Sequence, residues 1–185
     1  AGVDEVGRGS LVGPVFAAAV ILKKKINKKI LKDSKKLTKI NRQILEKYIK
    51  KNSYWSIGSA SLKEIEKLNI LNASLLAMKR AIIKLKKKPD QILVDGNKIP
   101  KIKNYNLKYV IKGDEKIPEI SAASIIAKVS RDRLIEKMSK KYTRYSWNKN
   151  AGYGTKDHLS AIKKFGITKH HRRTFQPIHN ILSLK

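Results

Sequence analysis

The pattern of apolar and polar positions predicts alternating strands and helices. Two strand-like runs open the chain at residues 2–7 and 12–22, and the glycine-rich turn between them favours a hairpin. The second run is almost wholly apolar, which is typical of a strand buried on both faces. Three more short strands are expected at 53–60, 91–95 and 107–112.

Helical periodicity occupies the intervals between these strands. Thr38 is placed to cap a helix, and Ser61 opens another with the spacing of a capping box. Longer helices are expected over 72–87 and 121–140, and a further one begins after Thr155. Strands that alternate with helices in this way indicate an α/β fold.

The chain has 185 residues and is 41% hydrophobic, which is enough for one well-formed core. We expect a catalytic core over residues 1–140 and a C-terminal helical segment over 141–185 that packs on it. Neither an internal repeat nor a flexible linker is apparent in the sequence.

Charge suggests a class of partner without fixing it. Lys and Arg number 43 against 14 Asp and Glu, giving a net charge of +29. Such a field attracts polyanions, but a coding bias toward AT-rich codons would produce the same excess of lysine. The lack of cysteine excludes disulfides, thiolate metal sites and cysteine nucleophiles. No apolar run reaches membrane-spanning length, so a cytoplasmic protein without a membrane partner is expected.

The few acidic residues separate into groups by their predicted surroundings. Six lie on predicted helices among lysines and are expected to be solvated: Glu46, Glu64, Glu66, Asp132, Glu136 and Asp157. Three lie in turns, where backbone contacts explain them: Asp33, Asp90 and Glu119. The five that remain are associated with strands: Asp4, Glu5, Asp95, Asp114 and Glu115.

Strand-associated carboxylates indicate a cation site. Asp4 interrupts an apolar strand, Asp95 ends one, and Asp114 follows the next. Buried carboxylates that converge repel one another unless cations neutralise them, and all-oxygen ligand sets suit Mg²⁺ or Mn²⁺. The alternative for any single acid is an ion pair with a Lys or Arg, and for Asp4 alone that alternative is the stronger one.

The orientations of Glu5 and Glu115 depend on the local geometry of the chain. In an ideal strand Asp4 and Glu5 face opposite sides, so Glu5 reaches the same region only if the strand end twists or its longer side chain bends round the edge. Glu115 neighbours Asp114 and is expected to point elsewhere.

Several blocks of sequence together resemble the ribonuclease HII family (type 2 ribonuclease H). The blocks, in chain order, are AGVDEVGRG at 1–9, DSKKL at 33–37, NIL at 69–71, DGN at 95–97, KGD at 112–114, ISAASIIAKV at 120–129, GYGT at 152–155 and HRRTF at 171–175. They cover essentially the whole chain, so the resemblance is specific.

The resemblance implies a ribonuclease H-like fold, in which helices flank a mixed five-stranded sheet with the first strand at its centre. It implies an endonuclease that hydrolyses the RNA strand of RNA–DNA hybrids. It also implies cutting on the 5′ side of ribonucleotides embedded in duplex DNA, as in ribonucleotide repair and DNA replication, leaving 3′-hydroxyl and 5′-phosphate ends. Asp4, Glu5, Asp95 and Asp114 would form the catalytic set and hold two Mg²⁺ or Mn²⁺ ions.

The resemblance also implies substrate contacts. Gly7, Arg8, Gly9 and Tyr153 would recognise the junction between a ribonucleotide and the deoxyribonucleotide that follows it. Further candidates for contact with the substrate are Ser34, Lys35, Lys36, Lys112, Ser121 and Lys128. For the lysines, solvated surface residues are the alternative. Arg172 and Arg173 would bind the duplex or hold the tail on the core, and we favour the second.

Two other functions fit parts of the sequence. A non-catalytic basic nucleic-acid-binding protein explains the charge but not the strand-associated acids. A DNA-acting nuclease on the same fold, such as a resolvase or integrase, would need no 2′-hydroxyl. A monomer is expected, and a sliding-clamp contact is not readable from the sequence.

Overall fold

A computed structural model describes residues 1–31 and 37–183, and it contains one mixed sheet of five strands in the order β3-β2-β1-β4-β5. The strands are β1 (Gly2–Val6), β2 (Val15–Leu22), β3 (Ser53–Ala60), β4 (Ile92–Asp95) and β5 (Leu107–Val110). The expected sheet with the first strand at its centre is therefore confirmed. Asp33, Ser34, Lys35 and Lys36 lie outside the described residues.

The strand pairing changes from antiparallel to parallel at β1. This strand pairs antiparallel with β2 and parallel with β4, so that Val3 lies opposite Ala19 on one side and Val94 on the other. β2 and β3 are antiparallel, whereas β4 and β5 are parallel. The second strand begins at Val15 rather than at residue 12, because Gly13 has a positive φ of 75° and Pro14 has no N–H to donate.

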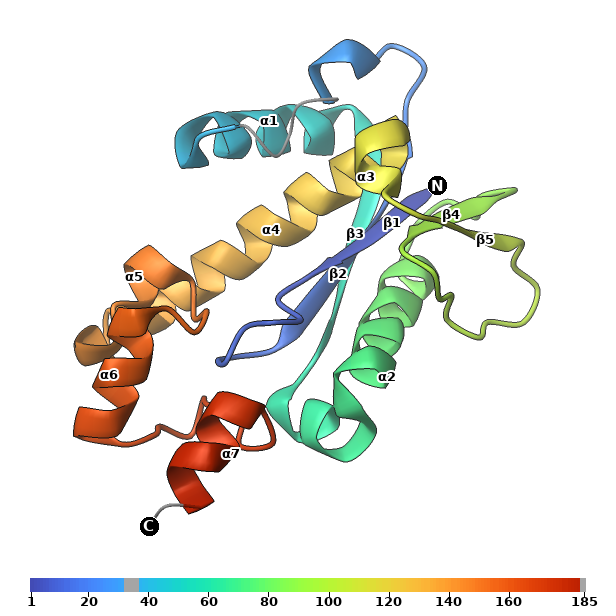
Figure 1. The fold of residues 1–185 in the computed structure, drawn as a ribbon. Helices are drawn as coiled ribbons and strands as arrows, with labels where there is room; N and C mark the ends of the chain where they lie inside the picture. Colours follow the sequence, from blue (N-terminus) through green and yellow to red (C-terminus); the bar gives the residue numbers. More distant parts are fainter. Residues whose placement is uncertain (32–36, 184–185) are drawn as a thin grey trace.

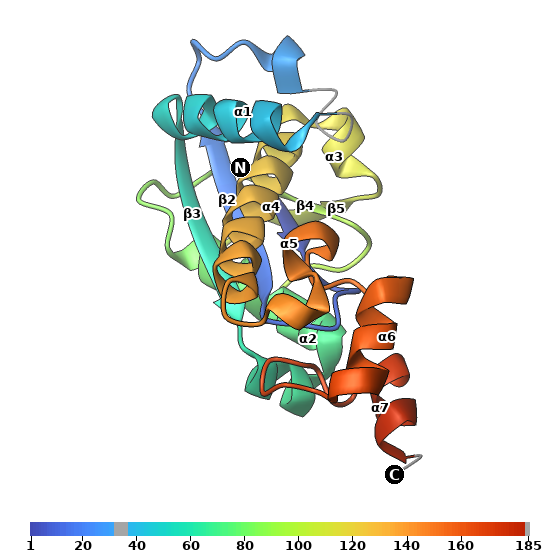
Figure 2. The same cartoon turned by 90° about the vertical axis from the view of Figure 1, so that its left-hand side faces the viewer.

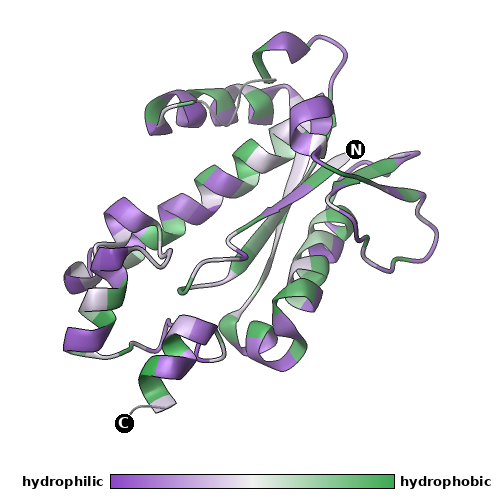
Figure 3. Ribbon diagram, viewed as in Figure 1, coloured by the Kyte–Doolittle hydropathy of each residue, from purple (hydrophilic) through white to green (hydrophobic). Residues whose placement is uncertain are grey.

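Helices cover both faces of the sheet (Figures 1 and 2). The helices of the described residues, in chain order, are η1 (Lys28–Leu31), α1 (Lys39–Lys51), α2 (Leu62–Ile83), α3 (Gly113–Lys116), α4 (Pro118–Ser139), η3 (Thr143–Tyr145), α5 (Trp147–Asn150), α6 (Lys156–Phe165) and α7 (Gln176–Ser183). α2 packs on one face, and α1 and α4 pack on the other. Along the helices hydrophilic and hydrophobic segments alternate, as expected for elements with one buried side (Figure 3).

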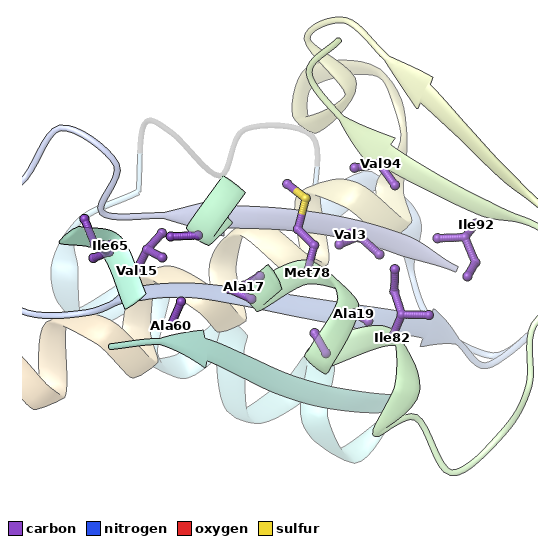
Figure 4. Close-up of a cluster of buried hydrophobic side chains, with 13 residues drawn as sticks. Val3, Val15, Ala17, Ala19, Ala60, Ile65, Met78, Ile82, Ile92 and Val94 are labelled. Atoms are coloured by element: carbon purple, nitrogen blue, oxygen red, sulfur yellow. The ribbon is translucent and has the colours of Figure 1, made fainter. Parts of the chain in front are cut away.

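β2 is buried on both faces, as its apolar sequence predicts. Ala17 and Ala19 contribute to the cluster with Met78 and Ile82 of α2 (Figure 4), whereas Ala18 faces the cluster under α1 and α4. Alternate residues of a strand point to opposite faces, so this run of alanines lets helices approach the sheet closely on both sides.

Local signals set the helix ends. Thr38 Oγ1 accepts a hydrogen bond from the N–H of Asn41, and Ser61 forms the expected capping box with Glu64. The two helices expected after Ser61 meet at a kink at Asn69, which has a positive φ of 64°. α2 ends at Ile83, four residues before the expected end, and α4 begins three residues earlier than expected, with Pro118 in its first turn.

Two acids lie in surroundings that the sequence did not indicate. Glu46 was expected to be solvated, but it is 1% exposed and is bound by Arg133 at 2.9 Å and by Lys50 at 2.5 Å. Glu119 lies in the first turn of α4 rather than in a loop. The buried Glu46 carboxylate therefore ties α1 to α4 through the partly exposed Arg133, and it also has the i,i+4 partner Lys50.

The C-terminal helices lie beside the connection between β1 and β2 (Figure 1). Trp147, Ile162 and Ile178 form a cluster with Leu11 and Val12 from this connection. The same connection forms isolated bridges with the tail, between Ser10 and Tyr153 and between Val12 and His171. Residues near the two ends of the chain thus share one small core.

The contact between β3 and α2 gives a stability prediction. A Cβ at Gly58 would lie 2.1 Å from the carbonyl oxygen of Ala77, which is backbone and cannot move away easily. Gly58→Ala should therefore lower the free energy of unfolding by about 1–3 kcal/mol, measured by urea denaturation. Ser59→Ala, at the next position in the strand, is the control and should change it by less. An unchanged midpoint for Gly58→Ala would contradict the close packing.

Candidate active site

The pairing of β1 with β4 sets the position of two carboxylates. Val3 lies opposite Val94, so extending the parallel register by one residue sets Asp4 opposite Asp95. Side chains at matched positions of parallel strands point to the same face. Asp4 is only 6% exposed, and Asp95 is the last residue of its strand.

Hydrogen bonds orient both carboxylates. Asp4 Oδ1 accepts from the N–H of Glu5 at 2.7 Å, and the side chain of Ser124 also hydrogen-bonds to Asp4. Asp95 Oδ1 accepts from the N–H of Gly113 at 2.7 Å. A Cβ at Gly113 would lie 3.3 Å from the same oxygen, so glycine at this position allows the close approach.

Asp114 directly follows the glycine that binds Asp95. It lies in the first turn of α3, after Lys112 reverses the chain with a positive φ of 54°. Asp114 thus follows Gly113, whose N–H binds the Asp95 carboxylate. Glu115, the next residue, is exposed.

The acids of β1 and β4 interact electrostatically. Burial raises the pKa of Asp4 well above its usual value, and the negative charges of Glu5 and Asp95 raise it further. Burial also raises the pKa of Glu5, with Asp95 adding to the shift and Arg8 opposing it. Asp95 therefore raises the pKa of both Asp4 and Glu5, although these two residues are neighbours in one strand.

Glu5 is only partly neutralised by its basic neighbour. Arg8 Nη1 lies 3.2 Å from Glu5 Oε1, and about half of the Arg8 side chain is exposed. The other oxygen of this carboxylate, Oε2, is buried and has no hydrogen-bond partner among the described residues. A buried carboxylate oxygen without a donor is costly unless a cation approaches it.

The donor set fits a hard divalent cation in its chemistry. Its ligands would all be carboxylate oxygens, which Mg²⁺ and Mn²⁺ prefer, and a cation would relieve the repulsion among Asp4, Glu5 and Asp95. The cage is not preformed: within residues 1–31 and 37–183, no three His, Cys, Asp or Glu side chains are already arranged around an ion position.

The glycine-rich turn after β1 lies beside Tyr153. Ser10 forms a bridge with Tyr153, and a Cβ at Gly9 would lie 3.9 Å from Cε1 of the tyrosine ring. Gly7 has a positive φ of 92°, and a Cβ there would lie 2.2 Å from Nε of Arg131. The structure thus brings Gly7, Arg8 and Gly9 together with Tyr153, although more than 140 positions separate Ser10 from Gly152 in the sequence.

Two buried arginines support this turn. Arg131 donates to Ser10 Oγ at 2.6 Å and to the carbonyls of Val12 and Ala151 at 3.0 Å. Arg172 donates to the carbonyl oxygens of Gly13 and Arg8, both at 2.9 Å. The tail-holding role favoured for Arg172 is thereby confirmed.

Arg131 was not found from the sequence. It lies on a helix among other charged residues, and nothing in the spacing distinguishes it from its exposed neighbours. Burial lowers the pKa of both guanidinium groups, and each also lies close enough to the other for the Arg131 charge to lower the pKa of Arg172.

The remaining candidates lie in different surroundings. Ser121 is 1% exposed and donates its hydroxyl to the carbonyl of Leu31, so its expected contact with the substrate stays a prediction. Lys128 binds Asp132 at 2.8 Å and lies 5.9 Å from the centre of the Tyr153 ring. Lys112 is exposed. Ser34, Lys35 and Lys36 lie outside the described residues.

A mixed sheet in this strand order, with carboxylates on the central strand and on its parallel neighbour, defines a metal-dependent nuclease with a ribonuclease H-like fold. The chain belongs to the ribonuclease HII family, whose sequence model matches residues 1–178. It is therefore a ribonuclease H, an endonuclease that acts on RNA–DNA hybrids.

Individual relatives agree with this assignment. Ribonuclease HII of Pelagibacter ubique (strain HTCC1062) is 71% identical over 182 residues, covering 98% of each chain. The crystal structure of ribonuclease H2 from Pyrococcus horikoshii OT3 is 30% identical with a TM-score of 0.82, covering 99% of this chain and 96% of that one. The Archaeoglobus fulgidus RNase HII in its PCNA complex is 26% identical with a TM-score of 0.82, covering 97% and 95%.

None of the helices in the described residues is both long enough and apolar enough to cross a membrane.

The raised pKa values of Asp4 and Glu5 give a pH prediction for the metal-free protein. The folded state holds these protons more tightly than the unfolded state, so their contribution to stability is complete below the usual pKa values of 3.8 and 4.5 and is lost as pH rises through the raised values. Asp4→Asn removes one charge from the repelling set. With chelator present, its thermal midpoint should exceed the wild-type midpoint by a margin that grows with pH.

The comparison of thermal midpoints should be made from pH 4 to pH 8, so that other titrating groups cancel between the two proteins. Glu115→Gln, an exposed acid near the site, is the matched control and should show no such pH-dependent margin. If the Asp4→Asn margin were zero or negative at pH 8, the acids would not repel one another as described.

Proposed function

We propose that this chain hydrolyses the RNA strand of RNA–DNA hybrids and also cuts on the 5′ side of ribonucleotides embedded in duplex DNA, leaving 3′-hydroxyl and 5′-phosphate ends. The observation that carries the proposal is the parallel β1–β4 register, which continues to set the buried Asp4 opposite Asp95, next to Glu5. The negative charges of Glu5 and Asp95 add to the rise that burial causes in the pKa of Asp4, which supports a cation site here. Such work would remove ribonucleotides from DNA during repair and replication, in the cytoplasm where that DNA lies.

The catalytic set we propose is Asp4, Glu5, Asp95 and Asp114, with two Mg²⁺ or Mn²⁺ ions. When bound, the ions would lower the pKa of the attacking water and stabilise the leaving 3′ oxygen. The protein's own part is to hold oxygen donors in place: backbone N–H groups fix one oxygen of Asp4 and one of Asp95. The unpartnered Oε2 of Glu5 supports its assignment as a ligand.

Recognition of the substrate is assigned to the turn at Gly7, Arg8 and Gly9 and to Tyr153. Glycine at position 9 leaves the backbone open for close approach, and the half-buried ring of Tyr153 lies next to it. The backbone would hydrogen-bond the 2′-hydroxyl, and the ring would stack on the following deoxyribose, where a missing hydroxyl leaves room.

Basic residues would offset phosphate charge around this centre. Lys128 lies beside Tyr153, and the exposed Lys112 adjoins the turn that carries Asp114. We assign both to phosphate neutralisation, and Ser34, Lys35 and Lys36 to phosphate contacts farther from the cut. We further propose a monomer with a catalytic core at 1–140 and a helical segment at 141–185 that contributes Tyr153.

Cleavage assays on carboxylate variants test the catalytic set. With Mg²⁺ and a duplex carrying one ribonucleotide, wild type should cut at the 5′ side of that ribonucleotide. Asp4→Asn and Asp95→Asn should lower kcat roughly 100-fold or more, since each removes a cation ligand, while circular dichroism shows an unchanged fold. Glu115→Gln should retain activity. An active Asp95→Asn protein would exclude the proposed centre.

The same assay separates the competing functions. A non-catalytic binder would retain the duplex without cutting it. A DNA-acting nuclease would cut an all-DNA duplex of the same sequence, which this chain should leave intact.

Tyr153 gives a separate prediction. Tyr153→Ala should lower kcat/KM on the single-ribonucleotide duplex by about tenfold, in line with the loss of one stacking contact. Tyr153→Phe retains the ring and should stay near wild type. Thermal midpoints of both variants report on packing, and a fall in the Ala midpoint that accounts for the lost activity would show that Tyr153 serves the fold instead.

A further inference from the structure

A buried pair of histidines lies next to Tyr153. His158 of α6 is 0% exposed and His171 is 2% exposed, and their Nε2 atoms lie 3.2 Å apart. Trp147, 1% exposed, donates its Nε1–H to His158 Nε2 at 2.9 Å. The catalytic scheme above uses none of these residues.

The surrounding donors fix the tautomer of each ring. The backbone N–H of Thr168 points at His171 Nδ1 at 2.8 Å, so Nδ1 accepts and the neutral ring carries its proton on Nε2. Trp147 can only donate, so His158 Nε2 accepts from both Trp147 and His171. The proton of His158 must then lie on Nδ1, which donates to the carbonyl oxygen of Tyr153 at 2.9 Å.

Protonation would disrupt this arrangement. A second proton on His158 would face two donors, and one on His171 would face the Thr168 N–H. Burial lowers the pKa of both rings, that of His171 to about 4. Both rings are therefore neutral at physiological pH.

The pair also links Tyr153 to the glycine-rich turn. His171 pairs with Val12, and its neighbour Arg172 donates from its backbone to Leu11 and from its guanidinium to the carbonyl of Arg8. Contacts therefore run without interruption from the Tyr153 carbonyl through His158 and His171 to the turn at Arg8. Every polar ring atom in the pair has a partner, which makes the link rigid.

We propose that His158 is a positioning residue for substrate recognition: through His171 it sets the spacing between Tyr153 and the Gly7–Gly9 turn. The inference rests on the proposed function and deepens it. A ribonucleotide–deoxyribonucleotide junction is read by two elements from opposite ends of the chain, so the distance between them decides whether the sugar of the deoxyribonucleotide fits against the ring. Burying two histidines and a tryptophan in full hydrogen bonding holds that distance.

Two substitutions separate the roles of the two ring nitrogens. In His158→Asn the amide nitrogen takes the position of Nδ1 and can still donate to the Tyr153 carbonyl. In His158→Gln the longer side chain reaches the Nε2 position and can accept from Trp147, but it leaves the Tyr153 carbonyl without its donor. Each variant loses some of the contacts of His158 and is expected to be less stable than wild type. The thermal midpoints of the two variants are therefore measured, so that a loss of substrate preference can be compared with the loss of stability.

The readout is the junction preference, measured in two ways. One is kcat/KM with Mg²⁺ on a single-ribonucleotide duplex divided by that on a uniform RNA–DNA hybrid. The other is the ratio of affinities for the single-ribonucleotide duplex and an all-DNA duplex in Ca²⁺, where binding is followed by fluorescence anisotropy. His158→Gln should lose about tenfold of the preference, mainly through KM, whereas His158→Asn should keep most of it.

The outcomes distinguish the two proposals. If wild type neither cuts nor prefers the ribonucleotide duplex, the proposed function fails, and this inference fails with it. If wild type behaves as proposed but both variants keep the preference, or both lose it in proportion to lost stability, the histidines only pack the tail and the positioning role is overturned.

Discussion

The parallel pairing of β1 with β4 is the constraint on which the site depends. It sets Asp4 opposite Asp95. Burial raises the pKa of Asp4, and the negative charges of Glu5 and Asp95 raise it further. Such an arrangement is unfavourable for the fold taken alone. The surrounding structure offsets this cost with hydrogen bonds from the Glu5 and Gly113 amides and with a tightly packed, alanine-rich β2. A central strand that carries charge is stable because the helices on both faces fix its position.

The second part of the site is assembled from the two ends of the chain. The turn after β1 supplies glycines, and the tail supplies Tyr153 together with the groups that hold it. Arg131 and Arg172 donate hydrogen bonds to carbonyl oxygens of the connection between β1 and β2, and His158 binds the carbonyl oxygen of Tyr153. The two segments therefore hold each other in place through these contacts.

Much of the fold could be predicted from the sequence, because its signals are local. The caps at Thr38 and Ser61 and the apolar run of β2 act within a few residues. The strand-associated acids could be selected because a carboxylate in an apolar strand is conspicuous. Glu46, Arg131 and Ser121 could not be placed, since their burial is decided by helix packing over long sequence distances. Their local patterns match those of exposed residues.

The two buried guanidinium groups bear on the excess of lysine. Both are 0% exposed, and the hydrogen bonds that they donate within the described residues go to neutral oxygens. Dissolved ions screen charges at the surface far more than charges in the interior. Salt therefore screens the positive charge of these two groups less than it screens the charge of the surface lysines. Even if codon usage alone produced those lysines, Arg131 and Arg172 would still set positive charge beside the turn.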